Sequence, residues 1–358
     1  MGLLKYIEIL NFKKKVSTKS IVIFTRQLST LIAASLPLVK ALRTLHDQLE
    51  QGTLKGIIKT VADEVESGSN FSEALSHFSG VFPDFYINMI KAGEQGGMLE
   101  DILKRLSEFL DKTQRLKDRI KSALMYPMFV MLVAVLILIM LMVFVIPTFT
   151  NMFSELGGSL PVPTRILIVT SEITRRAWFL IPLIPAIFIA LYKAFIKNPD
   201  RKLIVDRLKL NIPVVGPLIQ QVAVARFSRT LGTLLSSGVP ILAALQTVRD
   251  TIGNEFIARA VMQVRDSIKE GESVSGPMDA SKAFPPLVTK MINIGEETGQ
   301  LDKMLVQIAD NFEEEVDVTV SGLTSLLEPL LIVFMGLVVG FIVVAMFMPL
   351  FSLAKLIG

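Results

Sequence analysis

The chain contains a long apolar run, from Ser122 to Ser154, that has no Asp, Glu, Lys or Arg. A helix needs about 20 apolar residues to cross roughly 30 Å of hydrocarbon, and this run is longer. We therefore predict a transmembrane helix over residues 122–149. Pro127 falls in the first turn of this span, where a helix tolerates proline, and Pro147 falls where the chain must kink or leave the helix.

The same span occurs a second time, 202 residues downstream. Pro127 and Pro147 have counterparts in Pro329 and Pro349, and the residues between the second pair are again uncharged. The sequence predicts a second copy of the helix over residues 329–350, followed by a short tail, 351–358. Gly336 and Gly340 within it form a pair of small residues four apart, which lets another helix approach closely.

Composition supports a protein that is partly in a membrane and partly in water. Hydrophobic residues make up 51% of the 358, and polar segments with 37 Lys and Arg and 33 Asp and Glu separate the apolar runs. The absence of cysteine excludes disulfides, thiolate chemistry and cysteine-ligated metals. The basic clusters flank the apolar runs and do not alternate with aromatic residues, which argues against nucleic acid as a partner.

The segment ahead of the first span is predicted to be a bundle of six helices. Apolar residues recur there at spacings of three and four, and prolines and glycines interrupt the pattern. Asn70 and Glu73 have the spacing of a capping pair for the fourth helix, and the sixth runs into the span without a stop signal. The predicted helices cover residues 19–34, 37–50, 53–66, 71–78, 83–93 and 99–121, after a basic lead-in over 1–17, so that the first repeat is 18–121.

The bundle is duplicated together with its span. At an offset of 202 or 203 residues, several short motifs of the first half meet near-identical motifs of the second half, which is a stronger signal than any single motif. The matched pairs are Phe24–Leu31 with Phe227–Leu234, Leu36–Leu38 with Val239–Ile241, Phe82–Pro83 with Phe284–Pro285, and the Gly-Glu-x-x-Gly-x-Leu motifs Gly93–Leu99 and Gly295–Leu301.

Two equivalent bundles on one side of a membrane require an even number of crossings between them. Residues 177–196 supply the predicted second crossing, which leaves a polar loop over 150–176 and the second repeat over 197–328. Seven basic residues precede the first span between 101 and 121, six follow the second between 193 and 213, and three lie in the loop. The positive-inside rule places both bundles in the cytoplasm, and the N-terminus lacks a secretory signal.

At these motifs the chain resembles the inner-membrane platform proteins of type IV pilus and type II secretion machines, the PilC/GspF family. The duplicated pattern of Phe-x-Arg-x-Leu, a small residue with proline, Gly-Glu-x-x-Gly-x-Leu and a span covers residues 20–352. Many members have a longer N-terminal segment, and Ser35 stands where glycine commonly precedes the proline, as Gly238 does in the second copy.

The resemblance implies an all-α protein of a bacterial inner membrane, multi-pass, with two six-helix cytoplasmic bundles, three spans and a cytoplasmic N-terminus. It implies a platform without enzymatic activity or cofactor. A cytoplasmic assembly ATPase would dock beneath it, and its movement would help to lift pilin or pseudopilin subunits into a growing fibre. Other inner-membrane assembly proteins, lipid and further copies of the chain are the remaining expected partners.

The repeated motifs supply the candidate functional residues. We expect Gly93 and Gly295 to end helices in the left-handed conformation. We expect Glu94, Glu296 and Glu297 to lie near the positive N-terminus of the next helix. The alternative is that these turns contact a motor or the other copy. The candidates for partner contact or structure are Arg26, Pro37, Gly93, Glu94, Gly97, Leu99, Arg229, Pro240, Gly295, Glu296, Gly299 and Leu301.

Arg26 and Arg229 lie on otherwise apolar helical faces, where a buried guanidinium needs a carboxylate partner. We expect ion pairs within each repeat, with partner docking as the alternative.

No catalytic or metal site is predicted. His46 and His77 have no counterparts in the second repeat, no phosphate-binding loop is present, and no nucleophile pairs with a base; the acidic helix ends leave open whether a divalent cation binds. A small-solute transporter is one alternative, although the first and third spans contain no ionisable residue. A membrane peptidase acting on fibre subunits is the other, and no aspartate pair supports it.

Overall fold

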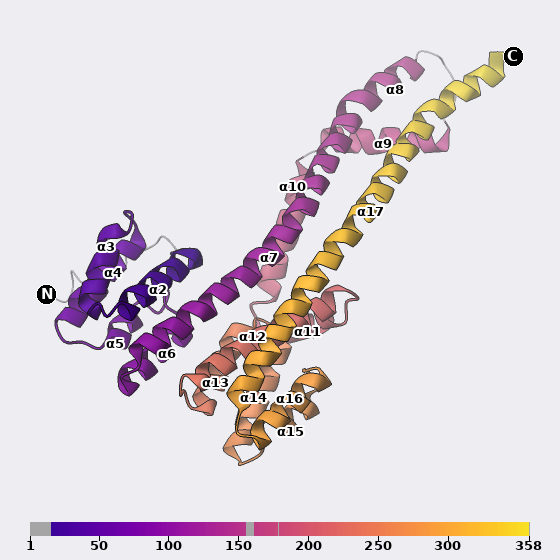
Figure 1. Ribbon diagram of the computed structural model, residues 1–358. Helices are drawn as coiled ribbons and strands as arrows, with labels where there is room; N and C mark the ends of the chain where they lie inside the picture. The colour runs from indigo at the N-terminus through magenta and orange to yellow at the C-terminus, as the bar shows by residue number, and fades with distance from the viewer. Residues whose placement is uncertain (1–15, 155–160, 178, 358) are drawn as a thin grey trace. The chain divides into compact units, whose positions relative to one another are not determined.

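The computed structural model describes residues 16–154, 161–177 and 179–357, and within these ranges every regular element is helical. The predicted lead-in therefore falls mostly outside the described residues. The chain divides into two compact units (Figure 1). The first unit contains residues 1–118 and 203–316, and the second contains residues 119–202 and 317–358.

The first unit contains most of both predicted repeats, and each has the expected six helices, which confirms the duplication. The first repeat consists of α2 (Thr18–Ala33), α3 (Leu38–Gln48), α4 (Thr53–Glu66), α5 (Phe71–Ser76), α6 (Asp84–Gly96) and the start of α7 (Leu99–Met140). The second consists of α12 (Val215–Ser236), α13 (Ile241–Ile252), α14 (Glu255–Lys269), α15 (Ser275–Ser281), α16 (Pro286–Glu297) and the start of α17 (Leu301–Ile357), preceded by α11 (Pro199–Leu210).

The two repeats bury equivalent cores. In the first, Phe24 and Phe82 are buried with ring centroids 6.3 Å apart, and at the matching positions of the second, Phe227 and Phe284 lie 4.9 Å apart. These pairs connect the first helix of each repeat to the segment just before the fifth. Tyr86, fully buried, donates to or accepts from the Thr25 hydroxyl at 3.1 Å, and burial raises the pKa of its phenol.

Helices α7 and α17 continue from the repeats into apolar sequence without a break. Two helical stretches in the described ranges are long and apolar enough to span a membrane, Leu99–Thr150 and Leu301–Pro349. Pro127 and Pro329 therefore lie inside helices and not in a first turn. The sequence analysis placed Pro127 in the first turn of a span beginning at residue 122, but it also expected the sixth helix to run into the span without a stop, and the continuous α7 confirms that expectation. The helix tolerates the loss of one hydrogen bond at Pro127.

The middle of the chain contains α10 (Leu180–Phe195), whose apolar stretch Leu183–Phe195 is shorter than those two stretches. The crossing over 177–196 accordingly stays a prediction. Helices α11 and α12 together are also apolar but are bent by 114°, and α12 buries Phe227, Leu231 and Leu234 in the core of the first unit.

The segment that we expected as a polar loop contains a helix. Helix α9 (Val162–Arg176) occupies most of it, whereas residues 155–160 lie outside the described ranges. Pro163 lies at the start of α9, where its missing N–H costs no helical hydrogen bond. At Pro147 the helix does not end: a π-helical turn, η1 (Leu141–Val145), leads into α8 (Ile146–Ser154).

Candidate functional site

The glutamate of each repeated motif caps the short helix of its own repeat. The Glu94 carboxylate accepts hydrogen bonds from the backbone N–H groups of Phe71, at 2.5 Å, and Ser72, at 3.0 Å, and from the Ser72 hydroxyl. In the second repeat Glu296 accepts from the N–H groups of Val274, at 2.5 Å, and Ser275, at 2.9 Å. The carboxylates therefore satisfy otherwise unpaired donors at the N-termini of α5 and α15.

This arrangement corrects two sequence predictions. Glu94 and Glu296 bind the N-terminus of the preceding short helix, not that of the next helix. The expected capping pair is also absent, because the Asn70 side chain makes no capping hydrogen bond to α5. A carboxylate 23 residues away takes its place at the Phe71 N–H, and sequence spacing alone cannot reveal a contact of that separation.

The two glycines of each motif have different roles, and the predicted role belongs to the second one. Gly97 and Gly299 have φ angles of +66° and +68°, in the left-handed region, and follow α6 and α16. Gly93 and Gly295 instead lie inside those helices. A Cβ on Gly93 would lie 2.9 Å from Ile102 Cγ1, so this glycine permits close packing of α6 on α7.

The remaining motif residues mark helix starts. Leu99 and Leu301 are the first residues of α7 and α17 and pack, partly buried, against the core. Pro37 and Pro240 are the N-cap residues of α3 and α13. The structure thus gives each motif residue a role within its own repeat.

Arg229 and Arg26 make equivalent ion pairs that differ in burial. Arg229 is buried; its Nε lies 2.9 Å from Glu313 Oε1 and its Nη2 2.5 Å from Asp310 Oδ1. Arg26 pairs with Asp111, the residue equivalent to Glu313, at 3.8 Å, and its side chain is 57% exposed. The carboxylate partner expected for each arginine is present, but Arg26 is not a buried guanidinium.

Burial and neighbouring charges oppose each other in the Arg229 cluster. Burial alone would lower the pKa of Arg229, but hydrogen bonds to Glu313 and Asp310 outweigh it and raise the pKa. For Asp310, partial burial acts to raise the pKa, but the bonds from Lys112 and Arg229 lower it overall. Lys112, on α7, lies 2.7 Å from Asp310, on α17, so this cluster also connects the two repeats.

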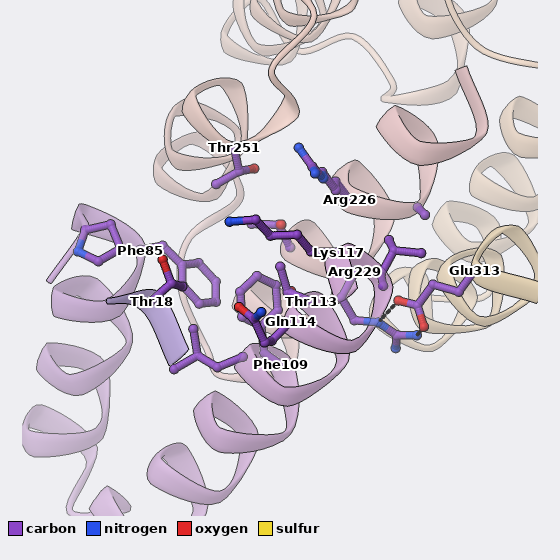
Figure 2. Close-up of a pocket in the computed structure, with 15 residues that line it drawn as sticks. Thr18, Phe85, Phe109, Thr113, Gln114, Lys117, Arg226, Arg229, Thr251 and Glu313 are labelled. Atoms are coloured by element: carbon purple, nitrogen blue, oxygen red, sulfur yellow. Dashed lines mark hydrogen bonds and ion pairs between the residues drawn. The ribbon is translucent and has the colours of Figure 1, made fainter. Parts of the chain in front are cut away.

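A pocket of about 320 Å³ lies between the repeats in the first unit (Figure 2). Its apolar side includes Phe85 and Phe109, whose ring centroids are 4.2 Å apart. Lys117 and Arg226 extend into it near Thr251. Among the described residues no carboxylate pairs with Arg226, and burial lowers its pKa. Lys117 and Arg226 thus place two cationic groups in the pocket, which Glu313, paired with Arg229, also lines. Sequence analysis missed Arg226, which looks like one more polar residue of α12.

Two further predictions concern metals and helix packing. Within the described ranges, no cluster of three or more His, Asp or Glu residues is placed to bind a metal ion. A Cβ built on Gly336 or Gly340 meets no atom within 4 Å. These glycines are thus not in close contact with another helix in the described part of this chain, and packing between chains stays a prediction.

Comparison with known proteins accounts for the duplication and its motifs. Residues 24–147 and again 227–349 match the family described as type II secretion system (T2SS), protein F. The type IV pilus assembly protein PilC of Thermus thermophilus is 43% identical over 95% of this chain and 83% of its own length, and PilC of Myxococcus xanthus is 40% identical over 95% and 81%. The type II secretion system protein F of Aeromonas hydrophila is 33% identical over 97% and 89%. These matches confirm the resemblance found from the motifs, and the chain belongs to the type II secretion system protein F family.

Proposed function

We propose that this protein is the inner-membrane platform of a type IV pilus or type II secretion pseudopilus, without catalytic activity of its own. The observation that carries the proposal is the family match at both repeats, each including the bundle and the span that follows it. Relatives named for pilus assembly and for type II secretion both match over nearly the whole chain.

The platform inserts with both repeats and the N-terminus in the cytoplasm and α9 on the other side. The basic residues around the spans support this orientation. It requires residues 177–196 to cross the membrane, so the protein has three spans. A cytoplasmic assembly ATPase then binds the repeats, and its movement is transmitted along α7 and α17 to the pilin or pseudopilin subunits in the bilayer.

The turns at Gly93–Leu99 and Gly295–Leu301 are still proposed to contact the ATPase. Because their glutamates cap helices, a different residue has to be substituted to test this contact. Reversing the charge of Glu94 or Glu296 would remove the caps of α5 and α15 and disturb the fold. The neighbouring Glu297 is exposed, and its carboxylate accepts a hydrogen bond only from Asn293, at 2.7 Å, among the contacts described. Glu297→Arg therefore tests the contact without removing a cap.

The experiment is retention of a co-expressed assembly ATPase and of major pilin by the full-length protein in detergent. The variants are Glu297→Arg and, as a matched control, Glu314→Arg. The control makes the same charge change at an exposed position of α17, more than three turns beyond the start of that helix. Loss of the ATPase with Glu297→Arg only, at an unchanged melting temperature, supports the turn as the contact. If wild type retains neither protein, the proposed coupling is wrong.

The pocket offers a second contact for an acidic partner residue. Arg226→Gln removes its unpaired guanidinium and leaves the paired Arg229 unchanged. If Arg226→Gln releases the ATPase and Glu297→Arg does not, the contact lies between the repeats.

Orientation is testable by cysteine labelling, because the natural sequence contains no cysteine. Spheroplasts that contain a single-cysteine variant are treated with a membrane-impermeant maleimide. The variants are Gln51→Cys in the first repeat, Arg165→Cys in α9 and Ser273→Cys in the second repeat. We expect labelling only at position 165 before lysis and at all three positions after it. Labelling at both 165 and 273 before lysis would show that residues 177–196 do not cross.

A further inference from the structure

We propose that α9 lies in the interfacial layer of the bilayer with one face in lipid, held there by two hydroxyl groups that bind backbone carbonyls left free by Pro147 and Pro349. The inference depends on insertion of the two long apolar helices, as the proposed function does, but not on binding of an ATPase or pilin. The following contacts all lie within the second unit.

Each proline removes one hydrogen bond from its helix. In α17 the N–H of residue 349 would donate to the Ala345 carbonyl, but proline has no N–H. At Pro147 the helix is in π register, as the bond from the Ile146 N–H to the Leu141 carbonyl shows. In that register residue 147 would donate to Met142, whose carbonyl is left without a helical partner.

Helix α9 supplies a donor to both carbonyls. The Thr164 hydroxyl donates to the Ala345 carbonyl at 2.6 Å, and the Ser171 hydroxyl donates to the Met142 carbonyl. Thr164 and Ser171 are both buried and seven residues apart, two turns on one face of α9. Leu167, between them, packs in a cluster with Ile146 and Ile342.

These contacts set the depth of α9. Met142 lies seven residues before the end of the first predicted span, at 149, and Ala345 lies five residues before the end of the last one, at 350. At 1.5 Å per residue the two bonded carbonyls are about 10 and 8 Å inside the ends of the spans. Amphipathic helices bind membranes at this depth, at the boundary of headgroups and acyl chains.

The side of α9 opposite its buried face is an apolar stripe. Its four residues recur at spacings of four, three and four, and at about 100° per residue they lie roughly opposite Thr164 and Ser171. These residues are 50% to 68% exposed, and they are Val162, Ile166, Val169 and Ile173.

Charged residues lie about a quarter turn from the stripe. Arg165, Glu172 and Arg176 share that side, and Glu172 pairs with Arg176 at 2.6 Å. On the opposite side, Thr170 and Thr174 donate to carbonyls of α9 itself, both at 2.8 Å, so their hydroxyls need no water. One side of α9 thus suits water, one suits acyl chains, and one contacts the spans.

The exposed side chains of the neighbouring spans indicate that lipid covers the apolar stripe of α9. Phe144 and Val344, within two residues of the bonded carbonyls, are themselves 67% and 57% exposed. Side chains of the spans at this level face the bilayer, and the apolar stripe of α9 is anchored to the same level.

Spin labels on single cysteines test the position of α9 in the full-length protein in phosphatidylglycerol and phosphatidylethanolamine nanodiscs. The variants Ile166→Cys and Ile173→Cys place labels on the stripe, and Arg165→Cys and Glu172→Cys are matched controls on the charged side. We expect labels at 166 and 173 to collide more often with oxygen than with a water-soluble nickel chelate, and labels at 165 and 172 to show the reverse.

Two results would overturn the position in lipid. Nickel accessibility at 166 and 173 equal to that at 165 and 172 would place the stripe in water. Labels at 166 and 173 that are immobilised and reached by neither reagent would show that a protein covers the stripe.

The double variant Thr164→Val and Ser171→Ala tests the anchoring separately, because it removes both hydroxyls and keeps similar side-chain volumes. With the label at 166, we expect greater label mobility and a changed oxygen-to-nickel ratio. An unchanged spectrum and ratio would show that the two hydroxyl bonds do not hold α9.

Discussion

Arg229 Nε and Glu313 Oε1 are 2.9 Å apart, and the residues at the matching positions of the first repeat, Arg26 and Asp111, form the same pair at 3.8 Å. In both repeats the pair connects the first helix to the long helix that continues into the apolar sequence. The two copies differ in burial, since Arg229 is 7% exposed and Arg26 is 57% exposed.

This difference predicts unequal costs for removing the arginine. Arg229→Met leaves the partly buried Glu313 carboxylate without its cation, whereas Asp310 keeps Lys112, and it should lower the free energy of unfolding by about 3 kcal/mol. Arg26→Met should lower it by less than about 1 kcal/mol, because exposed pairs contribute little. Thermal melting of the two variants in the same detergent measures the difference. Equal shifts of the two melting temperatures would contradict the prediction that the buried pair contributes more to stability.

The Asp310 carboxylate predicts a pH dependence of stability. Its pKa in the folded protein is lowered, since the bonds from Lys112 and Arg229 outweigh partial burial. The contribution of ionised Asp310 to the free energy of unfolding is therefore complete above its unfolded-state pKa, near 4. This contribution is lost as the pH falls through the lower folded-state pKa. The Asp310 side chain is half exposed, so the contribution is below about 1 kcal/mol.

Melting temperatures of wild type and Asp310→Asn between pH 3 and pH 7 test this sign. We expect the advantage of wild type to be constant above about pH 5 and to shrink below pH 4. An advantage that grows as the pH falls would contradict the assignment.

The two glycines of each motif should respond to alanine for different reasons. Gly299→Ala forces a side chain into the left-handed region, at a cost of about 1 kcal/mol. Gly93→Ala brings a Cβ to 2.9 Å from Ile102 and should cost about 1 to 3 kcal/mol by overpacking. In an Ile102→Ala background, which removes Cγ1 and Cγ2 of Ile102, the cost of Gly93→Ala should become smaller, whereas the cost of Gly299→Ala should not change, as thermal melting of the single and double variants would show.

Ser35 predicts a stabilising substitution. Its φ of +61° is in the left-handed region, and the equivalent residue of the second repeat is Gly238, with φ +79°. Ser35→Gly relieves the strain of a side chain in this conformation and should raise the free energy of unfolding by up to about 1 kcal/mol. Gly238→Ser is the matched reverse change and should lower it, and the two melting temperatures should move in opposite directions.

Much of the fold follows from local patterns in the sequence. The spacing of apolar residues predicted the helices of the first repeat with ends that mostly lie within two residues of those observed, and the duplication predicted the second repeat. Local signals suffice there because each helix buries one face in its own repeat. Helix α9 was missed because it buries only a narrow face, and Thr164 and Ser171 in that face look polar in the sequence.

The roles of the motif residues were harder to predict. Sequence analysis identified Gly93, Glu94 and Gly97 as a unit but assigned the left-handed residue to the wrong glycine. It also assigned Glu94 to the wrong helix, since the Phe71 N–H is distant in sequence and close only after folding. The unequal burial of Arg26 and Arg229 depends on packing around each repeat, which equivalent sequences do not reveal.

The single helix α9 serves two sites that arose by duplication, and this limits how the two copies can change. A loss of Pro147 would leave the Ser171 hydroxyl competing with a restored helical N–H for one carbonyl, and a loss of Pro349 would do the same to Thr164. A substitution of the proline in either span therefore requires a compensating change in α9, which belongs to neither repeat. The segment between the repeats has no counterpart in the duplication, yet it contacts both repeated spans, so it links substitutions in one half of the chain to substitutions in the other.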